Sequence, residues 1–536
     1  MVDTDVLVVG AGPTGLTLAV ALGQKGVRCT LIEQKEAPQF LPKMERCNAR
    51  SLEIYRRMGL AEKIRAAGLP AHCSMDVFIV LSLIEPPLLR NHYPTVAEAK
   101  AEIATCHDGS LPLEPYQLIS QYTLEPLLKS VAEELLSVTV RFSCALEGFS
   151  QDPGKVTATV RNADGSNGTI TAAYMVACDG GASNVRRHLG IKLAGEANLL
   201  ELRQALYYCE DLYERIPIGQ GRHYHVADGQ STFLIVQDST RHFSLHSVVE
   251  KDSDMATMFE KTVAMPVKYD MLYVGAWRQN LLLAERFQEG RVFLAGDAAH
   301  LVIPTGGLGM NTGVGEATDL AWKLAGTLQG WGGPNLLTSY ETERRPVGAR
   351  NVAASTYASR GRRKWRSMYR PNMLDATPEG AETRANLVSV AELEQRKSNE
   401  MIGAELGYHY SGSPLIWPEP GEGPPDDFVT YVPSTCPGVR LPHVWLDDGT
   451  AMQDRIGNRN GYVLLRLGGS AADVAALGRA FGEIGAPFAV LYVPDARVRD
   501  VYGYDLLLLR PDLHVAWRGN QPPEEPARLA RTVTGH

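Results

Sequence analysis

The sequence predicts an α/β protein in which a Rossmann-type dinucleotide-binding domain is interleaved with an antiparallel sheet and followed by a small α/β domain. Three observations lead to this prediction. A Gly-x-Gly-x-x-Gly motif follows the first strand-like run, at residues 5–9. A second run of strand, acidic turn, glycine-rich loop and helix start occupies residues 291–316. Short β-like runs fill residues 200–285.

The composition is that of a globular chain long enough for two or three domains, with 536 residues, 44% hydrophobic and 21% charged. Its net charge of −8 gives no general attraction to nucleic acid or to an anionic membrane. The eight cysteines form no CxxC pair and no zinc-site spacing, so we expect no metal site and a reducing, cytoplasmic location. The apolar run Val6 to Leu22 is broken by glycines and lacks a basic start, which excludes a signal peptide.

Residues 5–34 form a complete βαβ pattern, with a strand, a glycine turn, a helix and a second strand that ends at Glu33. The glycine motif permits a tight turn, a close approach of pyrophosphate and close helix packing, and the acid is placed to bind a ribose hydroxyl. The unit predicts an adenine dinucleotide and leaves FAD and NAD open. The residues expected to bind it are Gly10, Gly12, Pro13, Thr14, Gly15, Glu33 and Gln34.

Two later segments offer polar groups to the same ligand. Arg46 precedes an amphipathic helix and is expected to reach cofactor phosphates, with helix-surface charge as the alternative. Gln121 opens the helix predicted within 115–136, where its amide would bind ribityl or phosphate oxygens or simply cap the helix. The β-like runs of 138–178 end at Asp179, and Ser183 then caps a short basic helix.

The segment 291–316 begins with a buried strand and places Asp297 at its carboxyl end, where open α/β sheets bind ligands. Gly306, Gly307 and Gly309 would let backbone N–H groups approach a flat ring. A helix predicted from Asn311 to Leu328 would present its positive end to an anionic ring, such as a reduced flavin. The alternative is that Asp297 only caps a turn.

The β-like runs of 200–285 predict an antiparallel sheet that covers the ring and forms one wall of a substrate pocket. Tyr224, His242 and His246 are the candidates to face the substrate, the alternative being ordinary core or surface residues. The basic run 359–370 is interpreted as a solvated helix face rather than a nucleic-acid or NADPH-phosphate site.

The C-terminal part alternates strand, helix and strand in a thioredoxin-like order without a CxxC motif, so it is expected to serve packing or dimer formation rather than disulfide exchange. The predicted domains are an FAD-binding domain at 1–385, in segments of about 1–75, 105–190 and 285–385; a substrate domain interleaved with it at about 76–104 and 191–284; a linker at 386–432; and a thioredoxin-like domain at 433–536.

The motif set resembles the single-component FAD-dependent aromatic hydroxylases. The resemblance is carried by Gly10–Gly15 with Glu33, by Asp179-Gly180 with Ser183 and Arg186, and by GDAAHLVIPTGGLGMNTG from Gly296. The pattern from Cys436 to Gly519 resembles the redox-silent thioredoxin-like domain of the phenol hydroxylase and hydroxyphenylpropionate hydroxylase branch, which also holds polyketide-tailoring oxygenases.

The resemblance implies that NADH or NADPH binds transiently and reduces FAD, and that O₂ then gives a flavin hydroperoxide that hydroxylates a phenolic ring, ortho to its hydroxyl group. Alternatives are an epoxidase or Baeyer–Villiger oxygenase acting on a polycyclic natural product, and a non-catalytic flavin-bound redox sensor. The resemblance implies a small aromatic substrate, a homodimer, and FAD contacts from Gly12, Glu33, Arg46, Gln121, Asp179, Gly296, Asp297, Gly307, Leu308, Gly309, Met310 and Asn311.

Two residues are expected at the reaction itself. Glu45 stands where several relatives have histidine, so the resemblance implies that it is the general base for the phenol. Its alternative role is a surface ion pair with Arg46 or Lys43. Pro304 would bring its backbone close to the ring at the reaction face.

Overall fold

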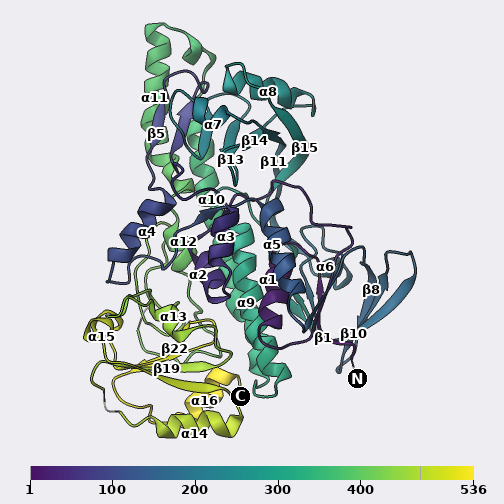
Figure 1. The fold of residues 1–536 in the computed structure, drawn as a ribbon, viewed down its shortest axis with the longest axis vertical. Coiled ribbons are helices and arrows are strands. Elements are labelled where there is room, and N and C mark those ends of the chain that lie inside the picture. Colours follow the sequence, from purple (N-terminus) through teal and green to yellow (C-terminus); the bar gives the residue numbers. More distant parts are fainter. Residues whose placement is uncertain (1, 422, 471) are drawn as a thin grey trace.

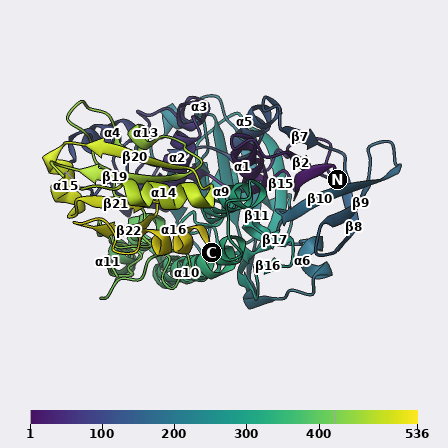
Figure 2. The same cartoon turned by 90° about the horizontal axis from the view of Figure 1, so that it is seen from below.

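The computed structural model of the protein describes residues 2–421, 423–470 and 472–536, which form two eight-stranded sheets, one four-stranded sheet and one two-stranded sheet. In Figure 1 the larger antiparallel sheet lies at the top, the parallel sheet at the centre right, and the C-terminal residues, in yellow-green and yellow, at the bottom left. Figure 2, from below, shows the C-terminal part beside the N-terminal part rather than over it.

The parallel sheet has the order β16-β17-β10-β1-β2-β7, and the β8–β9 hairpin extends it beside β10. All pairs from β17 to β7 are parallel, as expected for strands joined by crossovers through helices. The strands are β1 (Thr4–Val9), β2 (Cys29–Ile32), β7 (Val138–Arg141), β8 (Ala145–Gln151), β9 (Val156–Arg161), β10 (Asn167–Ala177), β16 (Gln288–Glu289) and β17 (Val292–Leu294).

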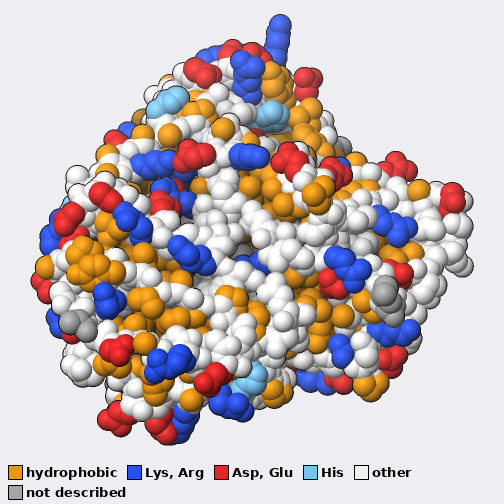
Figure 3. Space-filling view, turned by 60° about the horizontal axis from the view of Figure 1, so that its bottom comes forward, with side chains coloured by type: hydrophobic (Ala, Val, Ile, Leu, Met, Phe, Trp, Pro, Cys, Tyr) orange, Lys and Arg blue, Asp and Glu red, His pale blue; other side chains and the backbone are white. Residues whose placement is uncertain are grey.

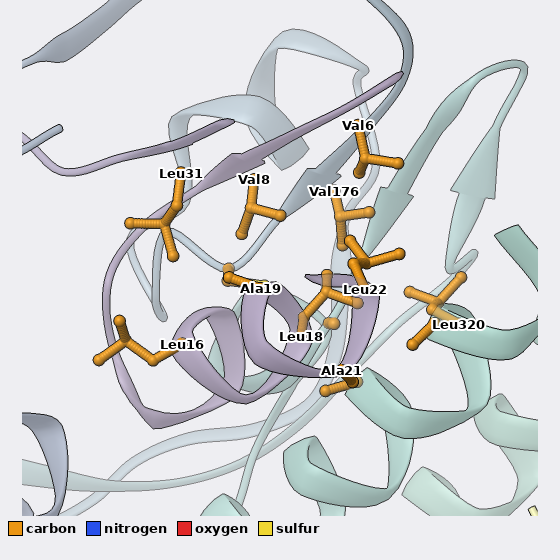
Figure 4. Packing of buried hydrophobic residues seen from close by; sticks show 14 of the residues in the cluster. Val6, Val8, Leu16, Leu18, Ala19, Ala21, Leu22, Leu31, Val176 and Leu320 are labelled. Atoms are coloured by element: carbon orange, nitrogen blue, oxygen red, sulfur yellow. The ribbon is translucent and has the colours of Figure 1, made fainter. Parts of the chain in front are cut away.

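An apolar layer joins this sheet to its helices. Val6 and Val8 of β1, Leu22 of α1 (Pro13–Gly23) and Leu320 of α9 (Gly309–Leu328) are fully buried and face one another in Figure 4. Helix α1 is apolar on every side because α5 and α9 flank it, which is the pattern of a buried helix. The surrounding helices are α2 (Ala49–Arg57), α3 (Ala61–Ala67), α5 (Gln121–Glu133), α6 (Asn184–His188) and α10 (Asn335–Arg366).

The second eight-stranded sheet has the order β18-β15-β11-β14-β13-β12-β4-β5 and is antiparallel except for the β12–β4 pair, as the sequence predicts. One face packs against α7 (Leu212–Arg215) and α8 (Asp254–Val263). The other face lies toward α10, with Arg362 over Phe233. Because the sequence predicts that this sheet forms one wall of a substrate pocket, this face is named the substrate face below. The strands are β4 (Val77–Val80), β5 (Leu89–Asn91), β11 (Leu193–Tyr208), β12 (His223–Val226), β13 (Phe233–Val236), β14 (His242–Ser247), β15 (Asp270–Ala284) and β18 (His300–Leu301).

The C-terminal sheet has the order β20-β19-β21-β22, in which β19 and β20 are parallel and the other pairs antiparallel. With its helices it gives the predicted thioredoxin-like order. Its elements are α13 (Met452–Ile456), β19 (Tyr462–Leu467), α14 (Ala475–Ile484), β20 (Phe488–Val493), α15 (Ala496–Tyr502), β21 (Leu506–Leu509), β22 (Val515–Gly519) and α16 (Pro526–Thr534).

Helical structure reaches into the segment 386–432 that was predicted to be a linker. Helix α11 runs to Glu394 because its residues are good helix formers, and the dense Pro and Gly content starts only after residue 410. The domain limits themselves stay predictions. The remaining elements are β3 (Arg46–Cys47), α4 (Val96–Thr105), β6 (Gln117–Leu118), η1 (Gly296–Ala298), η2 (Pro371–Leu374), α11 (Pro378–Glu394), η3 (Arg396–Ser398) and α12 (Ile402–Leu406).

The cysteines, the surface charges and the apolarity of the helices can be compared with the composition. The cysteines are free thiols in the described part of the chain. Positive and negative side chains alternate over the face drawn in Figure 3. Among the described residues, we find no helix of the length and apolarity that crossing a bilayer requires.

A buried ionic cluster fastens the C-terminal part to α9 and α10. The Arg510 guanidinium bonds to Glu343 Oε1 at 2.6 Å and to Asp512 Oδ2 at 2.7 Å, and it lies 3.3 Å from Asp319 Oδ1. Lys323 Nζ donates to Asp319 at 2.7 Å and to Glu343 at 2.6 Å. Burial raises the pKa of the Glu343 carboxyl, but Arg510 and Lys323 lower it further, to about 2. Glu343 is therefore a carboxylate that depends on these two cations.

Replacing Arg510 with Met should lower the free energy of unfolding by about 3–5 kcal/mol, because it leaves buried carboxylates without their partner. Denaturant unfolding would measure the loss. The control is Arg497→Met, which removes an exposed ion pair with Asp447 and should cost at most about 1 kcal/mol. Equal stability of the two variants would contradict a structural role for the cluster.

Candidate functional site

The parallel strands end together, and this alignment gathers the predicted motifs at one edge. Val9 is paired with Ile32 on one side and with Ala177 on the other, and Ala177 is paired with Leu294. The residues that follow these strand ends therefore share the edge where open sheets bind ligands. They are Gly10, Glu33, Asp179 and Asp297.

Three motifs meet at this edge: the first is Gly10–Gly15, the second is the turn at Asp179, and the third is the turn at Gly296–Asp297. The first motif contacts the second through its glycines. Gly10 has a φ of +106°, and a Cβ there would collide with the carbonyl of Cys178, next to Asp179. A Cβ on Gly15 would collide with the carbonyl of Gly10. Gly12 instead faces open space, with no described atom within 4 Å of its Cβ position, and no side chain caps the α1 N-terminus that it begins. This is the geometry that a pyrophosphate requires.

The first motif also touches the third. A Cβ on Gly296 would lie 2.6 Å from Thr14 Oγ1, and one on Gly313 of α9 would collide with the same side chain. The Gly296 N–H donates to Glu316 Oε2 at 2.7 Å, and the other Glu316 oxygen pairs with His300 Nε2 at 2.9 Å. The buried Glu316 therefore fixes the turn that carries Asp297.

The acidic residues of the three motifs keep oxygen atoms available. Glu33 accepts the N–H groups of Ala11 at 2.9 Å and Lys35 at 3.0 Å, which orients its half-buried carboxylate. Asp179 accepts from Val185 through Oδ2, while its buried Oδ1 has no partner in the described chain. The Asp297 side chain is accessible to solvent. The surrounding protein still removes part of its hydration, and this burial raises its pKa.

The loop before α9 is formed by two residues that require glycine. Gly306 and Gly307 have φ of +93° and +66°, and a Cβ on Gly307 would lie 2.5 Å from Arg46 Nε. Arg46 is buried and donates to the Gly306 carbonyl. Asn311 Nδ2 donates to the Gly307 carbonyl at 2.6 Å, so its side chain holds the loop. The α9 N-terminus has no side-chain cap, and the exposed Pro304 lies at the loop's start.

These observations fit an FAD: an uncapped helix N-terminus beside Gly12, an unpartnered Asp179 oxygen, and an accessible Asp297 at the same sheet edge. The side chains of the other residues predicted to bind FAD have these environments. Gln121 donates to Glu125 at 2.6 Å, and Gln34 is exposed. Leu308 is the buried N-cap residue of α9, followed by the half-buried Gly309 and Met310.

Tyr224 does not face the substrate, and this prediction is corrected. Its ring stacks on Phe78 at 5.2 Å in the core beneath α8, and its hydroxyl donates to the Gly219 carbonyl at 2.9 Å. Side chains alternate along a strand, so His223 and His225 take the substrate face instead.

Glu45 pairs with His223, rather than with Arg46 or Lys43 as the alternative interpretation proposed. His223 Nε2 and Glu45 Oε2 are 2.7 Å apart, and Glu45 Oε1 accepts no hydrogen bond from the described residues. Burial raises the pKa of Glu45, but His223, Arg222 and Arg46 lower it more, so Glu45 is a carboxylate. Burial lowers the pKa of His223 below 6.5, which keeps the imidazole neutral and lets its N–H orient Glu45.

His246 lies on the same face of the sheet as His223 and His225 and forms part of an aromatic wall. It stacks on Phe233 at 4.5 Å and meets Trp277 edge-on at 5.7 Å, and burial lowers its pKa to about 3. His242 lies on the same face at its margin, where Nδ1 pairs with Ser239 Oγ at 2.8 Å. Whether these residues bind substrate stays a prediction.

The basic run 359–370 is only partly the solvated face that was expected. Arg360, Arg363 and Lys364 are exposed, but Arg362 and Trp365 turn toward the sheet, with the Arg362 guanidinium 5.2 Å from the centre of the Phe233 ring. A helical spacing from the buried Ala358 to Arg362 and Trp365 was the available signal. The missed His223 could have been inferred from the pattern His-Tyr-His only with the strand's register in hand.

The chain matches two family models, described as "FAD binding domain" over residues 3–355 and "Aromatic-ring hydroxylase, C-terminal" over residues 434–536. The 4-methyl-5-nitrocatechol 5-monooxygenase of Burkholderia sp is 31% identical, with 98% of this chain and 96% of the relative covered. The structure of RebC with bound 7-carboxy-K252c is similar with a TM-score of 0.90 at 31% identity, covering 99% of both chains. A ternary complex of aklavinone-11 hydroxylase with FAD and aklavinone gives 0.83 at 27% identity, covering 100% of both chains. The chain belongs to the FAD-dependent aromatic-ring hydroxylases, and it is a flavin-dependent aromatic monooxygenase.

Proposed function

We propose that the protein hydroxylates the phenolic ring of an aromatic substrate, ortho to its hydroxyl group, with O₂ and with NADH or NADPH as the transient reductant. The observation that carries the proposal is the Glu45 carboxylate, which His223 holds through one oxygen while the other has no hydrogen-bond partner among the described residues. Arg46, the next residue, bonds to Gly306 in the predicted ring-binding loop, so Glu45 lies between that loop and the substrate face.

Bound FAD would supply reduction of O₂ and transfer of one oxygen atom. Its nucleotide end would lie against Gly12 and Glu33, with Asp179 and Asp297 nearer the ring. The α9 N-terminus would stabilise negative charge on the ring, because its first N–H groups have no side-chain cap.

Glu45 acts on the substrate hydroxyl. Its free Oε1 accepts that hydrogen bond, which moves electron density into the ring and favours attack at the ortho carbon. Because the Glu45 pKa is lowered, the carboxylate polarises the hydroxyl and receives its proton only as charge develops during reaction. His223 is a positioning residue that keeps the free oxygen directed toward the ring loop.

We infer a multi-ring phenol as the substrate class. His225, Phe233, His246, Gln204 and Gly275 are paired in one row across β12, β13, β14, β11 and β15. Four strand spacings give this row a width of roughly 19 Å, with Trp365 and Gln395 packed on its His225 end. The relatives whose names mention aklavinone and 7-carboxy-K252c support the same substrate class.

Asp297→Ala should weaken FAD binding by about 10–100-fold, the value of a hydrogen bond to a charged group. The absorbance of flavin retained after gel filtration, and titration of the apoprotein with FAD, would measure it. Asp500→Ala, which removes an exposed carboxylate on α15, is the matched control. Full flavin occupancy in Asp297→Ala would exclude Asp297 from the cofactor site.

Glu45→Gln should lower the rate of hydroxylation by about 10–100-fold while the FAD content stays that of the wild type. Substrate-stimulated NAD(P)H oxidation, with the product identified by mass, would report the loss. Glu36→Gln, an exposed acid in the same loop, should be unaffected. Unchanged turnover in Glu45→Gln would remove this carboxylate from the mechanism.

The pH profile of hydroxylation should fall on the acid side, at a pH below 6.5. The active form is the unprotonated pair, and burial lowers the pKa of His223 from that value. In Glu45→Gln this limb should move to lower pH, because Glu45 raises the His223 pKa while Arg222 and Arg362 lower it. A limb at the same pH in both proteins would assign the titration to another group.

A further inference from the structure

Arg362 lies at the substrate face without a protein partner. Its Nε is buried, and none of its guanidinium nitrogens bonds to a residue within 2–421, 423–470 and 472–536. Its contact on this face is the ring of Phe233, with the guanidinium carbon 5.2 Å from the ring centre. Arg362 is half-buried, so its unpaired charge is partly removed from water, and this burial lowers its pKa to about 10.

Several other buried arginines of the described chain have protein partners. Arg510 bonds to three carboxylates, and Arg440 bonds to Glu53. Arg366, one helical turn after Arg362, donates to the carbonyls of Val226 at 3.1 Å and Thr232 at 3.0 Å. Arg466 of β19 also has no ion pair among the described residues, and its guanidinium lies over the Tyr492 ring. Arg362 differs from it in position, because it lies over Phe233 and within the electrostatic influence of the Glu45 carboxylate.

The substrate face carries an excess of positive charge. Arg222, next to His223 in the chain, is buried and its charge acts on Glu45. It donates only to the Asn399 amide oxygen at 2.8 Å, leaving Nε and Nη1 without partners in the described chain. Glu45 is the carboxylate that acts on Arg362, and His223 already occupies one of its oxygens. The neutral His246 adds no compensating charge.

We propose that the aromatic substrate bears a carboxylate and that Arg362 binds it. The inference rests on the proposed function, because it assigns the second end of the same substrate. A planar guanidinium matches a carboxylate with two parallel hydrogen bonds, and its place over Phe233 would bring the acid beside the aromatic wall of Phe233, His246 and Trp277. The phenolic hydroxyl would then point toward Glu45.

A matched pair of tricyclic phenols tests the assignment: danthron, a dihydroxyanthraquinone, and rhein, which adds one carboxylate to it. FAD-loaded protein would be titrated with each compound, with binding followed by flavin absorbance. The wild type should bind rhein more tightly than danthron. Arg362→Met should weaken rhein binding by about 10–100-fold and danthron binding by less than about threefold, since the carboxylate alone loses its charged partner.

Three controls sharpen the result. Arg363→Met removes the exposed neighbouring charge on α10 and should leave both affinities unchanged. Arg362→Lys should restore rhein binding in part. The melting temperature of Arg362→Met should equal or exceed that of the wild type, because an unpaired enclosed cation is removed. A structural arginine would show a lower melting temperature instead.

Equal weakening for both compounds in Arg362→Met would overturn the inference, as would a wild type that does not prefer rhein. A loss confined to NADPH titration would overturn it too, and would assign Arg362 to the nucleotide phosphate. Turnover separates the two proposals: selective rhein binding without hydroxylated product would refute only the proposed reaction, and hydroxylation without selectivity would refute only the carboxylate site.

Discussion

The parallel pairing of β1, β10 and β17 is the constraint on which the site depends. These strands are far apart in the chain, yet their register ends them at one level, so that Gly10, Asp179 and Asp297 follow at the same edge. The contact of Thr14 with Gly296 and Gly313 then closes the first motif onto the third. Because both partners of Thr14 are glycines, a side chain at either position would separate the motifs that a single nucleotide must bridge.

Helix α10 connects the C-terminal part of the chain to the substrate face. Near its start, Glu343 is held by Arg510 of the C-terminal part, and near its end, Arg362 lies over Phe233 of β13. The helix has 32 residues, which corresponds to roughly 48 Å at 1.5 Å per residue. The C-terminal part therefore holds in place the helix that carries Arg362, although the two contacts lie far apart along it.

The sequence was sufficient for features carried by local patterns. The GxGxxG unit, the cap at Ser183 and the helix after the glycine loop each depend on residues within about one turn or strand, and the structure contains all three. The substrate face was harder because it depends on strand register. A shift of one residue exchanges the faces of a strand, so Tyr224 was chosen where His223 and His225 are the residues on the face toward α10. The Glu45–His223 pair joins a loop to a strand of another sheet, and no sequence spacing could reveal it.

Two arginines differ in role according to whether they form ion pairs. Arg510 is surrounded by carboxylates, so its charge is neutralised within the protein and its energy goes into joining two parts of the chain. Arg362 has the same charge and is half-buried, but the described protein places an aromatic ring beside it in place of an acid. This arrangement does not stabilise the fold, because an apolar side chain would pack against Phe233 without the free-energy cost of burying a charge. An unpaired cation beside an oriented carboxylate gives the site two poles, and a molecule with an acid at one end and a hydroxyl at the other would satisfy both.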